Sequence, residues 1–311
     1  MITRRDLFSI TGRMAAGSIF TLAWWNALRG RIYASEKKYD LVAVKGGNSP
    51  VELFNTAISQ MGGMQRFIKK GGSVLIKPNI GWDRTPEYGA TTNPDLVAAV
   101  VRECYTAGAA KVYMFDHTCD QWQACYKKSG MQATAVKAGA ELVPASSSGY
   151  FVKTSIPGGR VLKEAQVHKL FLECDSIINI PVLKHHSSTV LTASMKNLMG
   201  VVWDRGEWHR AGLHQCIADF STLRRPDLVI IDGWRVMTRN GPRGYSVSDV
   251  QNMKYLFMSA DPVAADSAAA MVLAQSTGIK NPTDIRYIKI AGSMGLGRND
   301  LAKLNIKRIT I

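Results

Sequence analysis

The sequence of 311 residues has few cysteines, few acidic residues and no long apolar segment. Its five cysteines form no Cys-x-x-Cys pair, and their spacing is unlike that of iron–sulfur or zinc-ribbon proteins. A Gly-x-Gly-x-x-Gly turn after a strand and a Walker-type loop are both missing, so the two commonest nucleotide-binding motifs are excluded. The sequence therefore identifies no metal site and leaves the cofactor unknown.

Negative charge is also scarce. The chain has 24 acidic against 39 basic residues and a formal net charge of +15. Without residues 1–34, which hold five arginines and one aspartate, the charge is +11. The basic residues are scattered and lack interleaved aromatic residues, so nucleic acid is not an expected partner. The excess indicates a solvated basic surface and an anionic small-molecule ligand.

The first residues predict export. Arg4 and Arg5 precede an apolar run at residues 14–28, and Ala34 ends this segment. The order is typical of a twin-arginine signal peptide. The apolar run is shorter than the ~20 residues that span a bilayer. We therefore expect cleavage after Ala34, the twin-arginine export machinery as a partner, and a periplasmic or otherwise extracytoplasmic protein without a stable membrane span.

Alternating strand and helix patterns predict the fold. Short continuous apolar runs predict buried strands at residues 73–76, 111–115, 175–180 and 227–231. Sequence signals for helix starts lie near these predicted strands, at Ser49, Asn93 and Asp261. Asn93 and Asp261 are capping residues that are each followed by proline. We predict a single three-layer α/β domain over residues 35–311, with a mostly parallel or mixed sheet and helices on both faces.

Four further segments complete the prediction. We expect one helix over residues 122–137, an irregular β insert over 147–163, a helix over 189–199 and a last helix beginning at Asn281. Lys196 and Asn197 would then lie in the middle of an otherwise apolar helix.

Polar side chains follow four predicted strands, at the point where each strand ends. They are Lys77 and Asn79, Asp116 and His117, Lys184 to His186, and Asp232. Ligands of open α/β sheets bind beyond the carboxyl ends of the strands. We therefore expect these side chains to converge on one electropositive crevice, suited to a carboxylate, phosphate or phosphonate.

Four of the six histidines lie between residues 184 and 214. His185 and His186 are adjacent, so in an extended segment they point to opposite faces. His209 and His214 are five residues apart, which is not the same-face spacing of a helix. The histidines therefore favour acid–base chemistry, capping or packing over a transition-metal site.

One block is distinctive: Met195-Lys196-Asn197-Leu198-Met199-Gly200, preceded by Ile180-Pro181-Val182-Leu183-Lys184-His185-His186. Further motifs are Lys77-Pro78-Asn79, Asn240-Gly241-Pro242-Arg243-Gly244, residues 261–266 and Gly295-Leu296-Gly297. In these motifs the chain resembles the bacterial and archaeal family called domain of unknown function 362, over roughly residues 42–311. The resemblance implies no general activity. Some relatives carry an added iron–sulfur module, but this chain lacks its cysteine pattern.

We expect an exported enzyme that acts on an anionic small organic molecule. The candidate ligand-binding residues are Lys77, Asn79, Lys184, Lys196, Asn197 and Arg243. The candidate general acids or bases are His117, His185 and His186, and Asp232 would orient a histidine or lysine. Two alternatives stay open: a non-catalytic periplasmic ligand-binding or cofactor-carrier protein that uses the same pocket, and a cofactor-dependent oxidoreductase.

The cysteines offer one candidate disulfide, between Cys119 and Cys125, which flank a short polar and aromatic stretch. The odd number of cysteines leaves at least one thiol free. Cys104 and Cys174 lie in apolar segments and are expected in the core.

Overall fold

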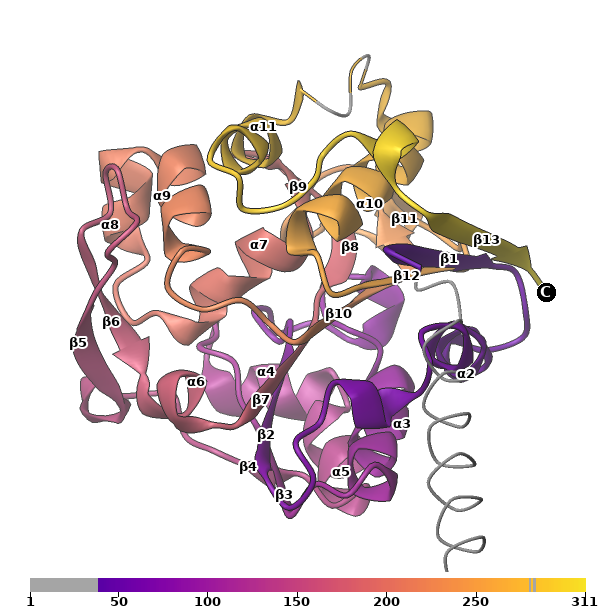
Figure 1. Cartoon of the computed structure of the whole chain (residues 1–311), viewed down its shortest axis with the longest axis horizontal. Coiled ribbons are helices and arrows are strands. Elements are labelled where there is room, and N and C mark those ends of the chain that lie inside the picture. Colours follow the sequence, from indigo (N-terminus) through magenta and orange to yellow (C-terminus); the bar gives the residue numbers. More distant parts are fainter. Residues whose placement is uncertain (1–38, 280, 282–283) are drawn as a thin grey trace, which may run out of the picture. The chain divides into compact units, whose positions relative to one another are not determined.

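A large sheet with helices on both faces organises the chain (Figure 1). The computed structural model describes residues 39–279, 281 and 284–311, and Tyr39–Ile311 form one compact unit. The strand order is β13 (Ile306–Thr310), β1 (Leu41–Lys45), β12 (Tyr255–Ser259), β10 (Leu228–Met237), β7 (Ser176–Ile180), β2 (Ser73–Pro78), β3 (Lys111–Met114) and β4 (Glu141–Leu142). Along this path only β12 is antiparallel to its neighbours, which confirms the predicted α/β fold with a mostly parallel sheet.

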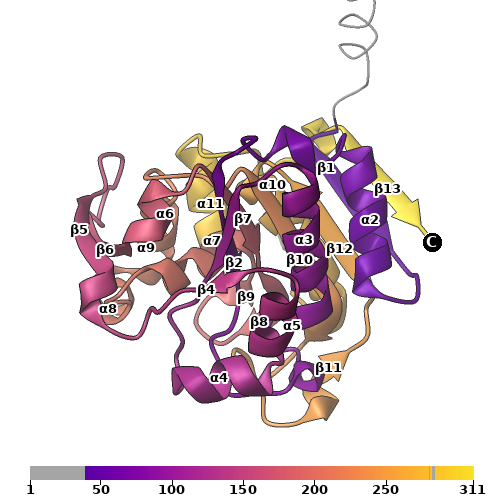
Figure 2. The ribbon, with the colours of Figure 1, turned by 90° about the horizontal axis from the view of Figure 1, so that it is seen from below.

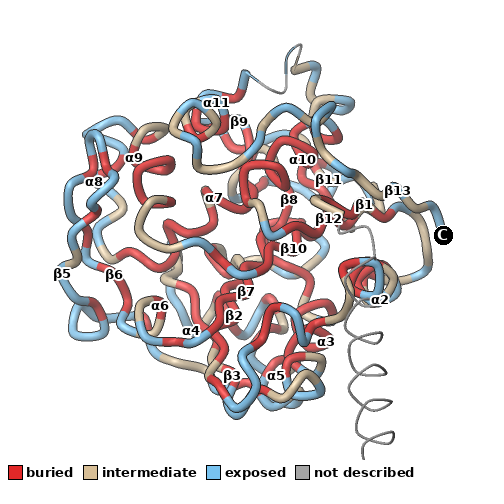
Figure 3. The backbone as a smooth tube through the Cα atoms, in the orientation of Figure 1, coloured by how far each residue is buried: buried red, intermediate tan, exposed pale blue. Residues whose placement is uncertain are grey.

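Helices cover both faces of this sheet (Figures 1 and 2). One face carries α2 (Pro50–Gln60), α3 (Pro94–Thr106), α4 (Trp122–Lys128) and α5 (Met131–Lys137). The other carries α6 (Lys169–Glu173), α7 (Ser194–Asn197), α8 (Gly206–Ala211), α9 (Leu213–Phe220), α10 (Pro262–Thr277) and α11 (Arg286–Ser293). The sheet therefore separates the two cores, and its central strands β2, β7 and β10 are buried (Figure 3).

Three helix starts follow from local sequence. The side chains of Ser49, Asn93 and Asp261 accept hydrogen bonds from backbone N–H groups in the first turns of α2, α3 and α10. A proline follows each cap, where its fixed backbone angle suits the first helical position. The predicted starts of these helices are confirmed.

Alternation along the strands decides which side chains face which core. In β2, Val74 and Ile76 face the α2–α3 side, whereas Leu75 faces the α10 side. Lys77 is two residues after Leu75 and therefore lies on the α10 side as well. In the parallel register Lys77 pairs with Asn179 of β7. Strand geometry thus places these two polar side chains next to each other, on the face that carries α7.

The predicted helix over residues 189–199 is wrong. The chain instead forms a hairpin of β8 (Val182–His186) and β9 (Val190–Thr192), followed by the short helix α7 and the 3-10 turn η4 (Leu198–Val201). β8 continues beyond β7 and pairs with the second half of β10. β9 pairs with β8, and this pairing holds residues 190–192 extended, which overrides the helical spacing of the apolar residues in that segment.

Other elements also differ from the prediction. Ser129 and Gly130, the latter with φ of 72°, divide the expected helix over 122–137 into α4 and α5. The β insert is a regular hairpin of β5 (Phe151–Ser155) and β6 (Glu164–His168), which lies near α8 in Figures 1 and 2. The helices α6, α8 and α9 were not predicted. The remaining short elements are η1 (Met64–Arg66), η2 (Pro86–Tyr88), η3 (Ser148–Tyr150), η5 (Val247–Asp249), β11 (Val250–Gln251) and η7 (Leu301–Lys303).

The last predicted helix begins later than expected, at Arg286. Its expected start at Asn281 borders residues 280 and 282–283, which lie outside the described part of the chain. The predicted signal peptide over residues 1–34 lies outside it too. Among the described helices, none is both long and apolar enough to cross a membrane.

A buried carboxylate links α10 to the segment after the hairpin. Asp266 accepts hydrogen bonds from the backbone N–H groups of Ser194, at 2.6 Å, and Met195, at 3.1 Å. Burial raises the pKa of this carboxyl to about 7. Asp266 therefore positions the first turn of α7 against the sheet, which brings Lys196 and Asn197 to the strand ends.

Candidate functional site

A cavity of about 480 Å³ lies at the carboxyl ends of β2, β3 and β8. Its polar wall includes Asn79, Cys119, Lys184, Thr192, Lys196 and Arg205. Trp82, Met199 and Pro242 contribute apolar surface. A cavity with apolar walls and a few convergent polar groups has the composition of a small-molecule site.

The charge of this wall is strongly positive. Lys184, Lys196 and Arg205 all line the cavity. Among its described lining residues Asp116 alone is acidic, and that carboxylate pairs with Lys77, 2.8 Å away. Because the carboxylate is already matched, three cationic side chains are left to interact with a ligand.

The Lys77–Asp116 ion pair lies beneath the cavity, with both side chains buried. The Lys77 ammonium also donates to the Pro78 carbonyl oxygen at 2.6 Å, and Asp116 accepts from the Ile80 N–H at 2.6 Å. Burial lowers the pKa of Lys77, and the neighbouring Asp116 carboxylate opposes that lowering. Lys77 is therefore a support of the site rather than a residue of its wall.

Gly200 makes room for this ion pair. A Cβ atom added there would lie 1.9 Å from Asp116 Oδ1 and 2.7 Å from Lys77 Nζ. The backbone N–H of His117 also donates to the Gly200 carbonyl oxygen at 2.9 Å. The glycine of the Lys196-Asn197-Leu198-Met199-Gly200 block is therefore required by close packing on the buried charges.

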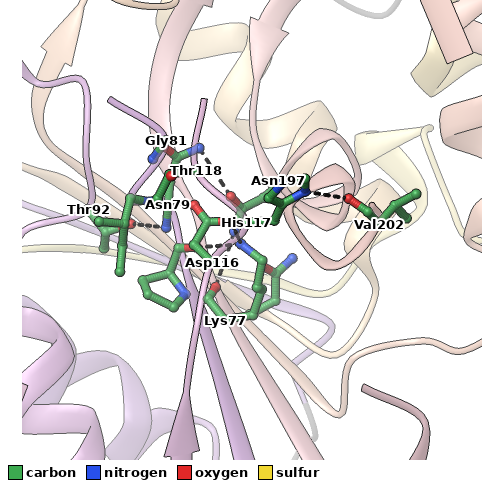
Figure 4. Close-up of polar contacts among 12 residues, drawn as sticks. Lys77, Asn79, Gly81, Thr92, Asp116, His117, Thr118, Asn197 and Val202 are labelled. Carbon is green, nitrogen blue, oxygen red and sulfur yellow. Dashed lines mark hydrogen bonds and ion pairs between the residues drawn. The ribbon is translucent and has the colours of Figure 1, made fainter. Parts of the chain in front are cut away.

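Three asparagines join the strand ends to α7. Asn197 donates to the Lys77 carbonyl oxygen at 3.1 Å and to Asn179 Oδ1 at 2.8 Å, and accepts from Asn79 Nδ2 at 3.1 Å. Asn179 in turn donates to the backbone and side-chain oxygens of Ser194. Figure 4 shows Lys77, Asn79, Asp116 and Asn197 close together at the strand ends. This network fixes α7, and with it Lys196, against the sheet.

Lys184 is a buried amine without a carboxylate partner among the described residues. Its Nζ donates to the Ala90 carbonyl oxygen at 2.5 Å and lies 3.4 Å from Asn79 Oδ1. Burial, opposed by Cys119 and assisted by nearby Lys196, lowers the pKa of Lys184 to about 7. Near neutral pH this amine can therefore gain or lose a proton, as general acid–base catalysis requires.

Lys196 is half-buried and reaches the same cavity from α7. Burial lowers its pKa to about 8; Cys119 opposes the shift and Arg205 adds to it. No ion pair or hydrogen bond to Lys196 occurs within the described part of the chain. Among the cations of the cavity, the Lys196 ammonium is therefore the most available for contact with a ligand.

The β8–β9 hairpin separates the two adjacent histidines. Lys184 and His186 lie on one face of β8 and line the cavity, whereas His185 lies on the other face and accepts from the Gly241 N–H. His186 Nδ1 accepts from the Ser188 N–H at 3.1 Å, so the neutral ring carries its proton on Nε2. Burial, with Lys196 and Lys184, lowers the pKa of His186 to about 2. His186 is therefore a neutral hydrogen-bond donor.

Three of the four candidate catalytic residues lie elsewhere. His185 is on the far face of the hairpin. His117 donates from Nδ1 to the Val202 carbonyl oxygen at 2.8 Å, stacks on Trp203 and lines a separate cavity. Asp232 shares its sheet face with Leu228 and Ile230 and accepts backbone hydrogen bonds from Asn93 and Trp234.

The role predicted for Asp232 is wrong for a geometric reason. Alternation along β10 directs its side chain toward the start of α3, opposite to the face that carries Lys77. Burial raises the pKa of Asp232 to about 6, and its partners are backbone N–H groups rather than a histidine or lysine. Arg243 is also misplaced in the prediction: its half-exposed guanidinium pairs with Asp120 at 3.2 Å and does not line the cavity.

The sequence reasoning missed Arg205, Cys119 and His209, all of which line the cavity. Arg205 donates to the carbonyl oxygens of His117 and Thr118 and so supports the segment after β3. A signal for Cys119 was present, because it directly follows the polar strand end at Asp116. Arg205 lies just before α8 and His209 lies within it, and no sequence pattern predicted this helix.

The candidate disulfide is not formed. Cys119 is exposed at the cavity, whereas Cys125 is buried in α4, and both thiols are free. The strand-to-helix connection directs the two side chains into different surroundings: Cys119 toward Arg205 and Cys125 into the α2–α3 core. Within the described residues, no three His, Cys, Asp or Glu side chains gather as a metal site would need.

Comparison with known proteins places the chain in a family. The model for the domain of unknown function DUF362 matches residues 74–271. The chain belongs to the DUF362 family. The matched segment starts in β2, ends in α10 and includes the entire cavity wall. The thylakoid-associated protein sll1697 of Synechocystis sp. is 28% identical over 232 residues, which cover 70% of this chain and 68% of that protein.

Replacing Gly200 with alanine tests the packing on the ion pair. We expect Gly200→Ala to lower the free energy of unfolding by about 3 kcal/mol or more, because a methyl group would separate buried Lys77 from Asp116. Urea denaturation measures this loss. Gly149→Ala is the control, since the nearest atom to its added Cβ is 3.9 Å away. Equal stability of the two variants would contradict the packing argument.

Lys184 should make stability depend on pH. The folded protein releases the Lys184 proton near pH 7, whereas the unfolded chain keeps it up to about the ordinary pKa of 10.5. Between these values the unfolded state binds more protons, so the free energy of unfolding should rise with pH. Relative to Lys184→Met, the unmodified protein should therefore gain stability from pH 7 to pH 9 in urea titrations. A pH-independent difference would show that Lys184 keeps its proton when folded. Lys137→Met, at an exposed position, is the control.

Proposed function

We propose that the protein binds an anionic small organic molecule in the strand-end cavity and acts on it as an enzyme. The observation that carries this proposal is the convergence of Lys184, Lys196 and Arg205 on one cavity of about 480 Å³ whose acidic residue is already paired. Partly desolvated cations attract a carboxylate or phosphate more strongly than cations in water do.

The neighbouring groups suit recognition of such an anion. The protonated Nε2 of His186 and the ammonium of Lys196 are donors, and the Arg205 guanidinium is fixed by its bonds to two backbone carbonyls. Trp82 and Met199 would contact the carbon skeleton of the ligand. An organic anion would contact both the hydrogen-bond donors and the apolar side chains, whereas an inorganic anion would contact the donors alone.

Lys184 is the group we propose for chemistry. Its amine is shared between protonated and neutral forms near pH 7, while His186 remains neutral. A neutral amine beside a bound anion can remove a proton, and its ammonium form can return one. The residues therefore support proton transfer on the ligand, and the identity of the reacting atom is left to experiment.

Binding is tested by thermal shift and native mass spectrometry with paired compounds: organic carboxylates and phosphates, and their neutral amides or esters. Anions should stabilise the protein and neutral partners should not. Lys196→Gln should weaken anion binding about tenfold or more, because a charged hydrogen bond is lost. Lys137→Gln removes the same charge from an exposed site of α5 and should have no effect. Equal responses to anions and neutral compounds would refute the proposal.

Anion affinity should also fall with rising pH. The pKa values of Lys184 and Lys196 are about 7 and about 8, so both lose positive charge as the pH rises through these values, whereas a carboxylate ligand stays ionised. Isothermal titration across this range should show a Kd that increases with pH. Conversion of the bound anion that is lost in Lys184→Met supports the enzyme. Binding without any conversion supports a ligand-binding or carrier protein.

We also propose that the protein is exported by the twin-arginine route. The support is the arginine pair before a short apolar run, and the thylakoid association stated for the Synechocystis relative is compatible with a role outside the cytosol. Exchanging Arg4 and Arg5 for lysine should retain a longer precursor in the cytoplasm. Fractionation and intact-mass measurement check this. Normal export of the double variant would exclude the twin-arginine route.

A further inference from the structure

Cys119 differs from the other cysteines of the chain. Cys104, Cys125, Cys174 and Cys216 are buried, and burial raises the pKa of each thiol, to about 12, 12, 11 and 11. Cys119 is exposed and lines the cationic cavity. It is therefore the cysteine that a ligand of this cavity would meet.

The backbone holds Cys119 in place over the segment after β2. The N–H groups of Cys119 and Asp120 both donate to the Gly81 carbonyl oxygen, at 2.8 and 3.2 Å. An added Cβ at Gly81 would lie 3.7 Å from the Cys119 sulfur. This loop is thus fixed to its neighbour, and the thiol has a defined position at the cavity wall.

One cation contacts the sulfur, and two more line the same cavity. The Arg205 guanidinium donates to Cys119 Sγ at 3.4 Å and anchors the two preceding carbonyls. Lys184 and Lys196 line the same cavity, and Cys119 opposes the lowering of the pKa that burial causes in both. Positive charge at the cavity would attract an anionic reagent to the place where this thiol lies.

A second observation points to a ligand at this place. Thr192 lines the cavity and is 3% exposed, yet its hydroxyl oxygen has no hydrogen-bond partner. Thr192 pairs directly with Lys184 in the β8–β9 register, so their side chains share one face of the hairpin. A buried hydroxyl without a partner is costly unless a ligand supplies one.

We propose that Cys119 is a covalent attachment site for small anionic disulfides of the glutathione class. The Cys119 thiolate attacks one sulfur of the disulfide; a new bond forms between the two sulfurs, the original disulfide bond breaks, and the other half leaves as a thiolate. That thiolate takes its proton from solvent. The disulfide itself is the oxidant, so electrons balance without a further reactant. This inference rests on the proposed anion-binding cavity.

The test compares two disulfides of opposite charge on the full chain. Oxidised glutathione is a net anion and cystamine is a dication, and intact-mass measurement follows the attachment of each. Relative to an unstructured cysteine peptide, we expect the protein to favour glutathione over cystamine by about tenfold or more, because the cavity concentrates anions. Peptide mapping should place the adduct on Cys119, and Cys119→Ser should abolish it.

Matched variants test whether the positive charge of the cavity, and not only the exposure of Cys119, causes the preference for glutathione. Lys196→Gln should reduce the preference for glutathione to near that of the peptide, and Lys137→Gln should leave it unchanged. A preference equal to the peptide's in the unmodified protein, or adducts on a buried cysteine, would overturn the inference. If anions shift the thermal stability but Cys119 does not react, the inference fails and the proposed function stands. If neither occurs, both fail.

Discussion

The buried ion pair between Lys77 and Asp116 is the constraint on which the site depends. A lysine at the end of a central strand is placed in the core by the alternation of β2, and burying its charge is costly unless an opposite charge meets it. Asp116, at the end of the neighbouring strand, supplies that charge, and Gly200 leaves space for it. The pair therefore ties β2, β3 and the η4 turn to one another beneath the cavity.

The asparagines extend this constraint to α7. Asn197 forms hydrogen bonds with the backbone of Lys77 and with the side chains of Asn79 and Asn179. One side-chain amide therefore links the ends of the adjacent strands β2 and β7. α7 has only four residues and could not be stable alone. Its position comes from these amides and from Asp266, which explains how Lys196 is held near Lys184 although both are cationic.

Much of the architecture could be predicted from local pattern. Apolar strands, proline after a capping residue and the order of elements led to the correct fold class, and the strand-end rule led to Lys184, Lys196 and His186 at one cavity. The predicted helix over 189–199 failed because its first part, β9, pairs with β8, which itself pairs with β10. Spacing within a short apolar stretch does not show which strand that stretch will pair with.

What the sequence by itself determined is the alternation of elements, the family motifs and the excess of positive charge. Tertiary structure alone decided which of those charges remain free. Asp232 follows a predicted strand as Lys77 does, but it lies within the longer strand β10, and the side-chain period of two directs the two side chains to opposite faces of the sheet. Arg205 belongs to the cavity because the chain after Gly200 folds back over β3. Pairing, burial and strand register are long-range properties, so no local pattern could have separated the supporting lysine, Lys77, from the two lysines that line the cavity.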